Sequence, residues 1–154
     1  MSTVRFSNVL ILSLSVACTE VKSSAVTTEG MYVDYEVVTE GDGTGSDVNT
    51  TLRVGGLTST TFVDLDGGDQ LTVSVGAENE VLSQQTFGVI HSYLGSFDAD
   101  TEGSEFVLSL DRVDMDGAPT TSATLPAAFT VTSPQMDETF SRSSDGDIVV
   151  NWDG

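Results

Sequence analysis

Between residues 31 and 111, apolar and polar residues alternate with a period of two, and no segment repeats with the 3.6-residue period of an amphipathic helix. In residues 31–37 the odd-numbered side chains are apolar, whereas Asp34 and Glu36 point the other way. Such alternation is typical of half-buried strands. The pattern predicts short strands at residues 31–37, 48–54, 60–65, 71–75, 81–82, 86–97 and 106–110. Their spacing is typical of a β-sandwich.

Glycine-rich and acidic clusters separate these strands and predict turns at residues 40–47, 55–56 and 66–69. Residues 86–97 are apolar on both faces, which predicts a central strand covered on each side, or a strand with a bulge. We therefore expect an all-β fold, an immunoglobulin-like antiparallel β-sandwich after an N-terminal signal peptide. An up-and-down barrel is the alternative. The single cysteine excludes an intramolecular disulfide.

The N-terminus has the pattern of a signal peptide over residues 1–17. Arg5 precedes an apolar stretch, residues 6–16, that is too short to span a bilayer, which takes about 20 residues. Leu14-Ser-Val-Ala-Cys18 resembles a lipobox, the processing sequence of bacterial lipoproteins, although Ser15 stands where that family carries a larger aliphatic residue. The resemblance implies a lipid on Cys18 and, because Thr19 rather than Asp follows it, delivery to the outer membrane. Several acyl chains would give a lasting anchor.

Three further regions follow the predicted signal peptide. Residues 18–29 are small and polar and predict a tether, and residues 30–117 hold the predicted sandwich. Residues 118–154 resemble the opening of a bacterial immunoglobulin-like or fibronectin-III-like module, with Phe129, Phe140 and Trp152 as its core anchors. Two alternatives are open for this last region: it begins a truncated second module, which we favour, or its strands pack onto the first sandwich.

The charge of the chain is strongly acidic, with 24 acidic residues against 5 basic ones and a net charge of −19. Removal of residues 1–17 would take away Arg5 and no acidic residue. Such a surface repels nucleic acid and anionic lipid head groups, so we expect no nucleic-acid partner. It suits high solubility, a salty habitat or divalent cations.

The sequence lacks the components of the common catalytic sites, and we expect a protein that is not an enzyme. His91 is the only histidine and lies in an apolar segment, where a hydrogen-bonded structural histidine is the expectation rather than a general base. One histidine and one lipidated cysteine cannot make an ordinary zinc site. Residues 41–45 are rich in glycine, but no lysine or predicted helix follows, which excludes a phosphate-binding loop.

Calcium is the best remaining chemical hypothesis, because acidic side chains recur at alternate positions in predicted loops. The candidate ligands are Asp98, Asp100 and Glu102 in one loop, and Asp111, Asp114 and Asp116 in another. Asp64, Asp66 and Asp69 form a third acidic group. Neither flanking helices nor the EF-hand spacing is present, so a solvated acidic turn is the simpler interpretation of each loop. No other cofactor is expected.

The whole chain is similar to acidic lipoproteins of Gram-negative marine or predatory bacteria built from β-sandwich modules. That resemblance implies a non-enzymatic envelope protein, held to the membrane by its N-terminal lipid, with an adhesion, scaffold or binding role toward a protein or polysaccharide. The alternative is a carbohydrate-binding or hydrolase-accessory module stabilised by calcium. A row of exposed aromatic side chains would favour the alternative, and Tyr32, Phe62 and Tyr93 are its candidates.

Overall fold

In the computed structural model of the chain, the structure describes residues 18–39, 43–118, 120–141 and 147–153. The predicted signal peptide, residues 1–17, lies outside these residues. The strands are β1 (Thr19–Lys22), β2 (Met31–Thr39), β3 (Ser46–Val54), β4 (Thr61–Asp64), β5 (Gln70–Val75), β6 (Glu78–Val81), β7 (Ser83–Phe87), β8 (Ile90–Phe97), β9 (Glu105–Asp111), β10 (Thr121–Thr124), β11 (Thr130–Ser133) and β12 (Asn151–Asp153). Two short 3-10 turns, η1 (Ser23–Ala25) and η2 (Thr28–Gly30), follow β1.

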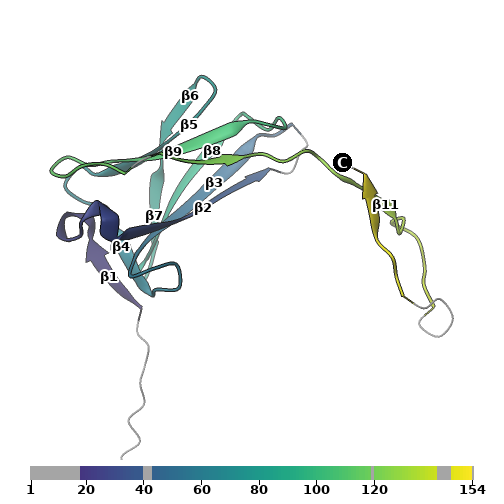
Figure 1. Cartoon of the computed structure of the whole chain (residues 1–154), viewed down its shortest axis with the longest axis horizontal. Helices are drawn as coiled ribbons and strands as arrows, with labels where there is room; N and C mark the ends of the chain where they lie inside the picture. The colour runs from purple at the N-terminus through teal and green to yellow at the C-terminus, as the bar shows by residue number, and fades with distance from the viewer. Residues whose placement is uncertain (1–17, 40–42, 119, 142–146, 154) are drawn as a thin grey trace, which may run out of the picture.

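Two sheets pack face to face and form the body of the molecule (Figure 1). Sheet A has the order β1-β4-β3-β8-β7, with β2 paired along β3, and sheet B has the order β10-β9-β5-β6. All pairings are antiparallel except β1 with β4, which is parallel. The prediction of an all-β sandwich is confirmed.

The core lies between the two sheets and follows the alternation of the sequence. Leu71, Val73 and Val75 of β5 are buried, and the residues between them are not. Phe97 of sheet A meets Phe106 of sheet B edge to face, with ring centroids 5.6 Å apart. Because successive side chains of a strand point to opposite faces, one apolar parity per strand is enough to form this core.

The predicted tether is wrong for most of its length. Residues 19–22 form β1, whose four residues pair in register with Thr61 to Asp64 of β4, and Ser23 is fully buried. The single long strand expected at residues 86–97 is also wrong. A turn at Gly88, with φ of 64°, divides this segment into β7 and β8. Both parities are apolar there because Phe87 and Ile90 lie beside the turn, and Phe87 is 85% exposed.

In the last third of the chain, one part packs onto the first sandwich and the other part lies apart from it. Strand β10 extends sheet B, and Leu125 lies in the core, so the sandwich continues past the predicted boundary at residue 117. Strands β11 and β12 pair with each other and lie away from the sandwich (Figure 1). Phe129, Phe140 and Trp152 are 69%, 36% and 64% exposed, so they do not act as core anchors here.

Candidate functional site

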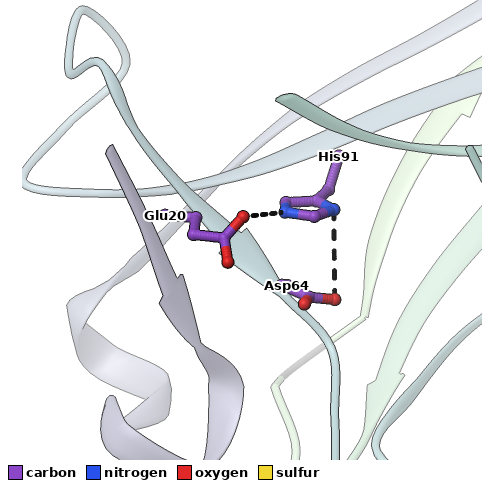
Figure 2. Close-up of side chains that lie close together, drawn as sticks. All are labelled: Glu20, Asp64 and His91. Carbon is purple, nitrogen blue, oxygen red and sulfur yellow. Dashed lines mark hydrogen bonds and ion pairs between the residues drawn. The ribbon is translucent and has the colours of Figure 1, made fainter. Parts of the chain in front are cut away.

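His91 lies where sheet A divides. Strand β8 pairs with β3 as far as Ser92, and at Arg53 the partner of β3 is Phe62 of β4 instead. Strands β1 and β4 therefore pass on one side of His91, and β7 passes on the other. This fork brings together Glu20 from β1, Asp64 from β4 and His91 from β8 (Figure 2).

Hydrogen bonds use both nitrogens of the His91 ring. Its Nε2 lies 3.2 Å from Glu20 Oε2, and its Nδ1 lies 3.0 Å from Gln84 Nε2 and 3.1 Å from Thr86 Oγ1. The Gln84 amide donates to Nδ1, and this fixes the tautomer in which Nε2 carries the proton and donates to Glu20. The His91 side chain is only 4% exposed, so these bonds satisfy a buried polar group.

Asp64 completes the cluster from below the ring (Figure 2). Its Oδ1 lies 3.9 Å from His91 Nδ1 and accepts a 2.8 Å hydrogen bond from Gln84, and its Oδ2 forms an ion pair with Lys22. Burial works against ionisation of Asp64, but the bonds from Lys22 and Gln84 outweigh it and hold the pKa of Asp64 below its usual value. Asp64 is therefore a carboxylate at neutral pH.

This cluster fits a hydrogen-bonded network better than a metal ion. Ligand atoms of Glu20, Asp64 and His91 lie within 4.8 Å of one another, the only such group of three among the described residues. However, the two carboxylates lie nearest to opposite nitrogens of the ring, Glu20 to Nε2 and Asp64 to Nδ1. Lys22 and Gln84 already donate to Asp64, and the ammonium would repel a cation.

A hydroxyl, an imidazole and a carboxylate also stand in a row here, as Thr86, His91 and Glu20. A general base needs a free lone pair on its nitrogen to take the proton of a nucleophile. The Gln84 amide donates to that same nitrogen at 3.0 Å. The arrangement therefore joins β1 to β8 and β7, and it does not present an available base.

A second cluster, which the sequence did not indicate, lies under the turn after β1. The side chain of Arg112 is 1% exposed and pairs at 3.0 Å with the side chain of Asp69, which is 6% exposed. Its other nitrogens donate to Ser23 O at 2.6 Å, Val26 O at 2.9 Å and Thr28 Oγ1 at 3.0 Å. One buried guanidinium thus holds the whole segment that follows β1.

Aspartates of the β4–β5 connection hold the same segment. Asp66 accepts hydrogen bonds of 3.0 Å from the Ser24 amide and from the Ser23 and Ser24 hydroxyls, and these bonds hold the pKa of Asp66 below its usual value. For Asp69, burial opposes ionisation, but bonds from the Val113 amide and Arg112 outweigh it and lower its pKa. Asp66 and Asp69 of the third acidic group therefore bind the protein's own backbone, and Asp64 binds the side chains of Lys22 and Gln84.

Cys18 is exposed and stands directly before β1. The next residue is already fixed, because the Thr19 amide donates to Thr60 O at 3.0 Å and its hydroxyl lies 2.8 Å from that of Thr61. No flexible segment separates Cys18 from the sandwich.

The predicted calcium ligands fall in two loops that the structure does not bring together. Asp98, Asp100 and Glu102 belong to the β8–β9 connection, and Asp111, Asp114 and Asp116 to the end of β9 and the loop after it. Within the described residues, neither set forms a group of three converging carboxylates. Asp111 accepts a hydrogen bond from Thr72 at 3.1 Å, and the backbone carbonyl of Asp116 accepts one from Thr28 at 2.6 Å. Calcium binding stays a prediction.

The three candidate aromatic residues do not form an exposed row. Tyr93 is 2% exposed, and its hydroxyl donates to Val63 O and accepts from the Leu65 amide. Phe62 is 7% exposed and lies 5.1 Å below the guanidinium of Arg53. Tyr32 alone is accessible, at 46%.

No protein family, no curated protein and no solved structure matches this chain. Among the described residues, no helix is long and apolar enough to cross a membrane. The site must therefore be interpreted from its own geometry.

Proposed function

We propose that this chain is a non-enzymatic, lipid-anchored β-sandwich module of a bacterial envelope, attached through Cys18 and delivered to the outer membrane. It would act there in adhesion, as a scaffold, or in binding a protein or polysaccharide. The observation that carries the proposal is the exposed Cys18 at the entrance of β1, directly after the lipobox-like segment.

The attachment of β1 supports this proposal, because an anchor is useful only if it is joined firmly to the body that it holds. Glu20 and Lys22 of β1 bind His91 and Asp64, while Arg112 and Asp66 hold the segment that follows. A lipid on Cys18 would thus be coupled to both sheets of the sandwich.

The arrangement of aromatic side chains favours the scaffold or binding role over a carbohydrate platform. Sugar-binding faces present flat aromatic rings to solvent, and here Phe62 and Tyr93 are in the core. Their burial leaves Tyr32 as the one accessible member of the expected row.

The anchor can be tested by expressing the whole chain in a Gram-negative host fed an alkyne fatty acid. We expect the label and a lipid mass increment on the membrane-bound protein, and accumulation of an unprocessed form when the lipoprotein signal peptidase is inhibited with globomycin. Cys18→Ser should abolish the label. The matched control is Thr19→Ser, which changes the neighbouring residue and leaves the thiol in place.

The proposal is refuted if the exported protein is cleaved near residue 17 and carries no lipid. It is also refuted if Cys18→Ser keeps the label. Mass spectrometry of the N-terminal peptide distinguishes these outcomes from a simple failure of expression.

A further inference from the structure

One end of sheet A gathers three segments that are distant in the sequence. Strands β1 and β4 run parallel and begin side by side at Thr19 and Thr61. The loop of residues 55–60 joins the end of β3 to the start of β4, and the turn at Gly88 joins β7 to the start of β8. Figure 1 shows this end of the sheet at the lower left, where β1, β4 and β7 are drawn. We call it the anchor end.

The two loops of the anchor end, β3–β4 and β7–β8, expose apolar side chains and carry no charge. Glu20 of β1, 43% exposed, is the nearest acidic residue in that strand. Residues 120–136 are likewise uncharged and expose Phe129 and Met136. Leu57 is 62% exposed, Phe87 85% and Ile90 36%. Residues 54–61 and 85–90 contain no acidic or basic residue, in a chain with 24 acidic residues. Single exposed apolar side chains are ordinary, but a group of them on an uncharged surface marks a contact site.

The opposite end of sheet A is acidic. Strand β3 begins there beside Asp47, and β8 leads there into the loop that carries Asp98, Asp100 and Glu102. An anionic membrane surface repels such a loop, and it does not repel an uncharged one. The distribution of charge therefore favours an orientation with the anchor end toward lipid.

The position of Cys18 allows the same orientation and restricts it further. One residue of extended chain spans at most about 3.6 Å, and Thr19 is already hydrogen-bonded to the β3–β4 loop through Thr60. A lipid on Cys18 would hold the two loops within reach of the head groups. Phenylalanine and leucine side chains are among those that bury at the boundary between head groups and acyl chains.

We infer that the anchor end, with Leu57, Phe87 and Ile90 at its surface, is a membrane-contact site that rests on the phospholipid bilayer holding the lipid of Cys18. The inference rests on the proposed function. The sandwich then stands with its acidic end away from the membrane and available to a partner.

The experiment uses the full lipidated protein in phosphatidylcholine vesicles whose acyl chains carry bromine, which quenches tryptophan on contact. The chain has one tryptophan, Trp152, and Trp152→Phe provides a background without one. In that background, Phe87→Trp and Leu57→Trp are separate reporters in the two loops. Val38→Trp is the matched control, because Val38 is 50% exposed at the opposite end of the sheet.

We expect the reporters at 87 and 57 to lose about half of their emission or more, as for a side chain that enters the head-group and acyl boundary. The reporter at 38 should keep its emission, and so should Trp152 in the unmodified chain. Unchanged thermal melting checks that each variant is folded, and the second loop reporter remains available if one variant is not.

The lipid on Cys18 is measured by mass in the same samples, which separates the two proposals. Lipidated protein without quenching at 87 and 57 overturns the membrane contact and leaves the anchor standing; the apolar end would then be a protein interface. Equal quenching at 38 also overturns it, because the sandwich would lie flat or tumble. Quenching at 87 and 57 in protein that carries no lipid supports the contact site and overturns the anchor.

Discussion

Replacement of Arg112 by methionine should destabilise the sandwich more than any other single charge change that we can identify. The guanidinium is 1% exposed and makes hydrogen bonds to Asp69, Ser23, Val26 and Thr28. Methionine fills a similar volume, so the change removes the charge and its bonds with little loss of packing. The Asp69 carboxylate, 6% exposed, then remains buried without its cation.

Breaking a buried ion pair by removal of one partner costs about 3–5 kcal/mol. Two backbone carbonyls, Ser23 O and Val26 O, also lose a donor, which places the expected loss toward the upper part of that interval. For a domain of this size, such a loss lowers Tm by roughly 10 °C or more. Urea unfolding of the wild type and the variant measures the difference directly.

The dependence of this loss on pH gives a more specific test. The folded-state pKa of Asp69 lies below its ordinary value, so its contribution to stability is present above the unfolded pKa and is lost as the pH falls through the folded one. Without Arg112, burial should raise the pKa of Asp69. We therefore expect the gap between wild type and variant to narrow as the pH falls from 7 to about 3.

Lys22→Met is the matched control, because the Lys22 side chain is 53% exposed in its pair with Asp64 and exposed pairs contribute little. Hydrogen exchange of residues 23–28 should rise in Arg112→Met, since Arg112 donates to Ser23, Val26 and Thr28. A loss below about 1 kcal/mol, or a gap that does not change with pH, would refute the reasoning.

Three further outcomes are expected. Burial raises the pKa of the Tyr35 and Tyr93 phenols to about 12. Their contribution to stability is therefore present below the ordinary pKa of 10.0 and is lost as the pH rises through 12. Two of the three tyrosines should ionise late in an ultraviolet titration, and early ionisation of all three would contradict this. Gly45→Ala should lower the free energy of unfolding by more than about 3 kcal/mol, because its Cβ would lie 2.2 Å from Phe97 O. Gly76→Ala has open space around its Cβ and should lower it by about 1–2 kcal/mol. Equal losses in urea unfolding would contradict this difference in geometry. Calcium at 1 mM should stabilise the chain by no more than about 0.4 kcal/mol, the value for a site with a millimolar dissociation constant. The reason is that the acidic side chains of the two loops do not converge within the described residues. A rise in Tm of many degrees would contradict this.

The sandwich could be predicted from the sequence because its central strands bury one face each. Leu71, Val73 and Val75 alternate with polar residues, and the structure buries those three side chains. The pattern of apolar and polar residues failed to predict a strand where strand formation depends on a neighbouring strand that is distant in the sequence. Thr19 to Lys22 contain one apolar residue, Val21, which is too little to predict a strand, and β4 offers the edge on which they form one.

The candidate site was missed for the same reason. Glu20, Asp64 and His91 are separated by more than forty and more than twenty residues. The parallel pairing of β1 with β4 and the shared neighbour β3 of β4 and β8 join them. Arg112 carried one available signal, as a basic residue between acidic neighbours in a chain with five basic residues. The expectation for His91, a hydrogen-bonded structural histidine, is confirmed by its contacts.

The parallel pairing of β1 with β4 also decides how the molecule responds to force. A pull on Cys18 along the axis of β1 draws that strand lengthwise past β4, so the bonds between Thr19 and Lys22 and their partners are strained in shear and must fail together. An antiparallel hairpin pulled from its open end would instead unzip one pair at a time. The side chains of Glu20 and Lys22 bridge this same junction to His91 and Asp64. The first strand of the chain is thus a mechanical clamp, able to pass tension into the sandwich without first being peeled away.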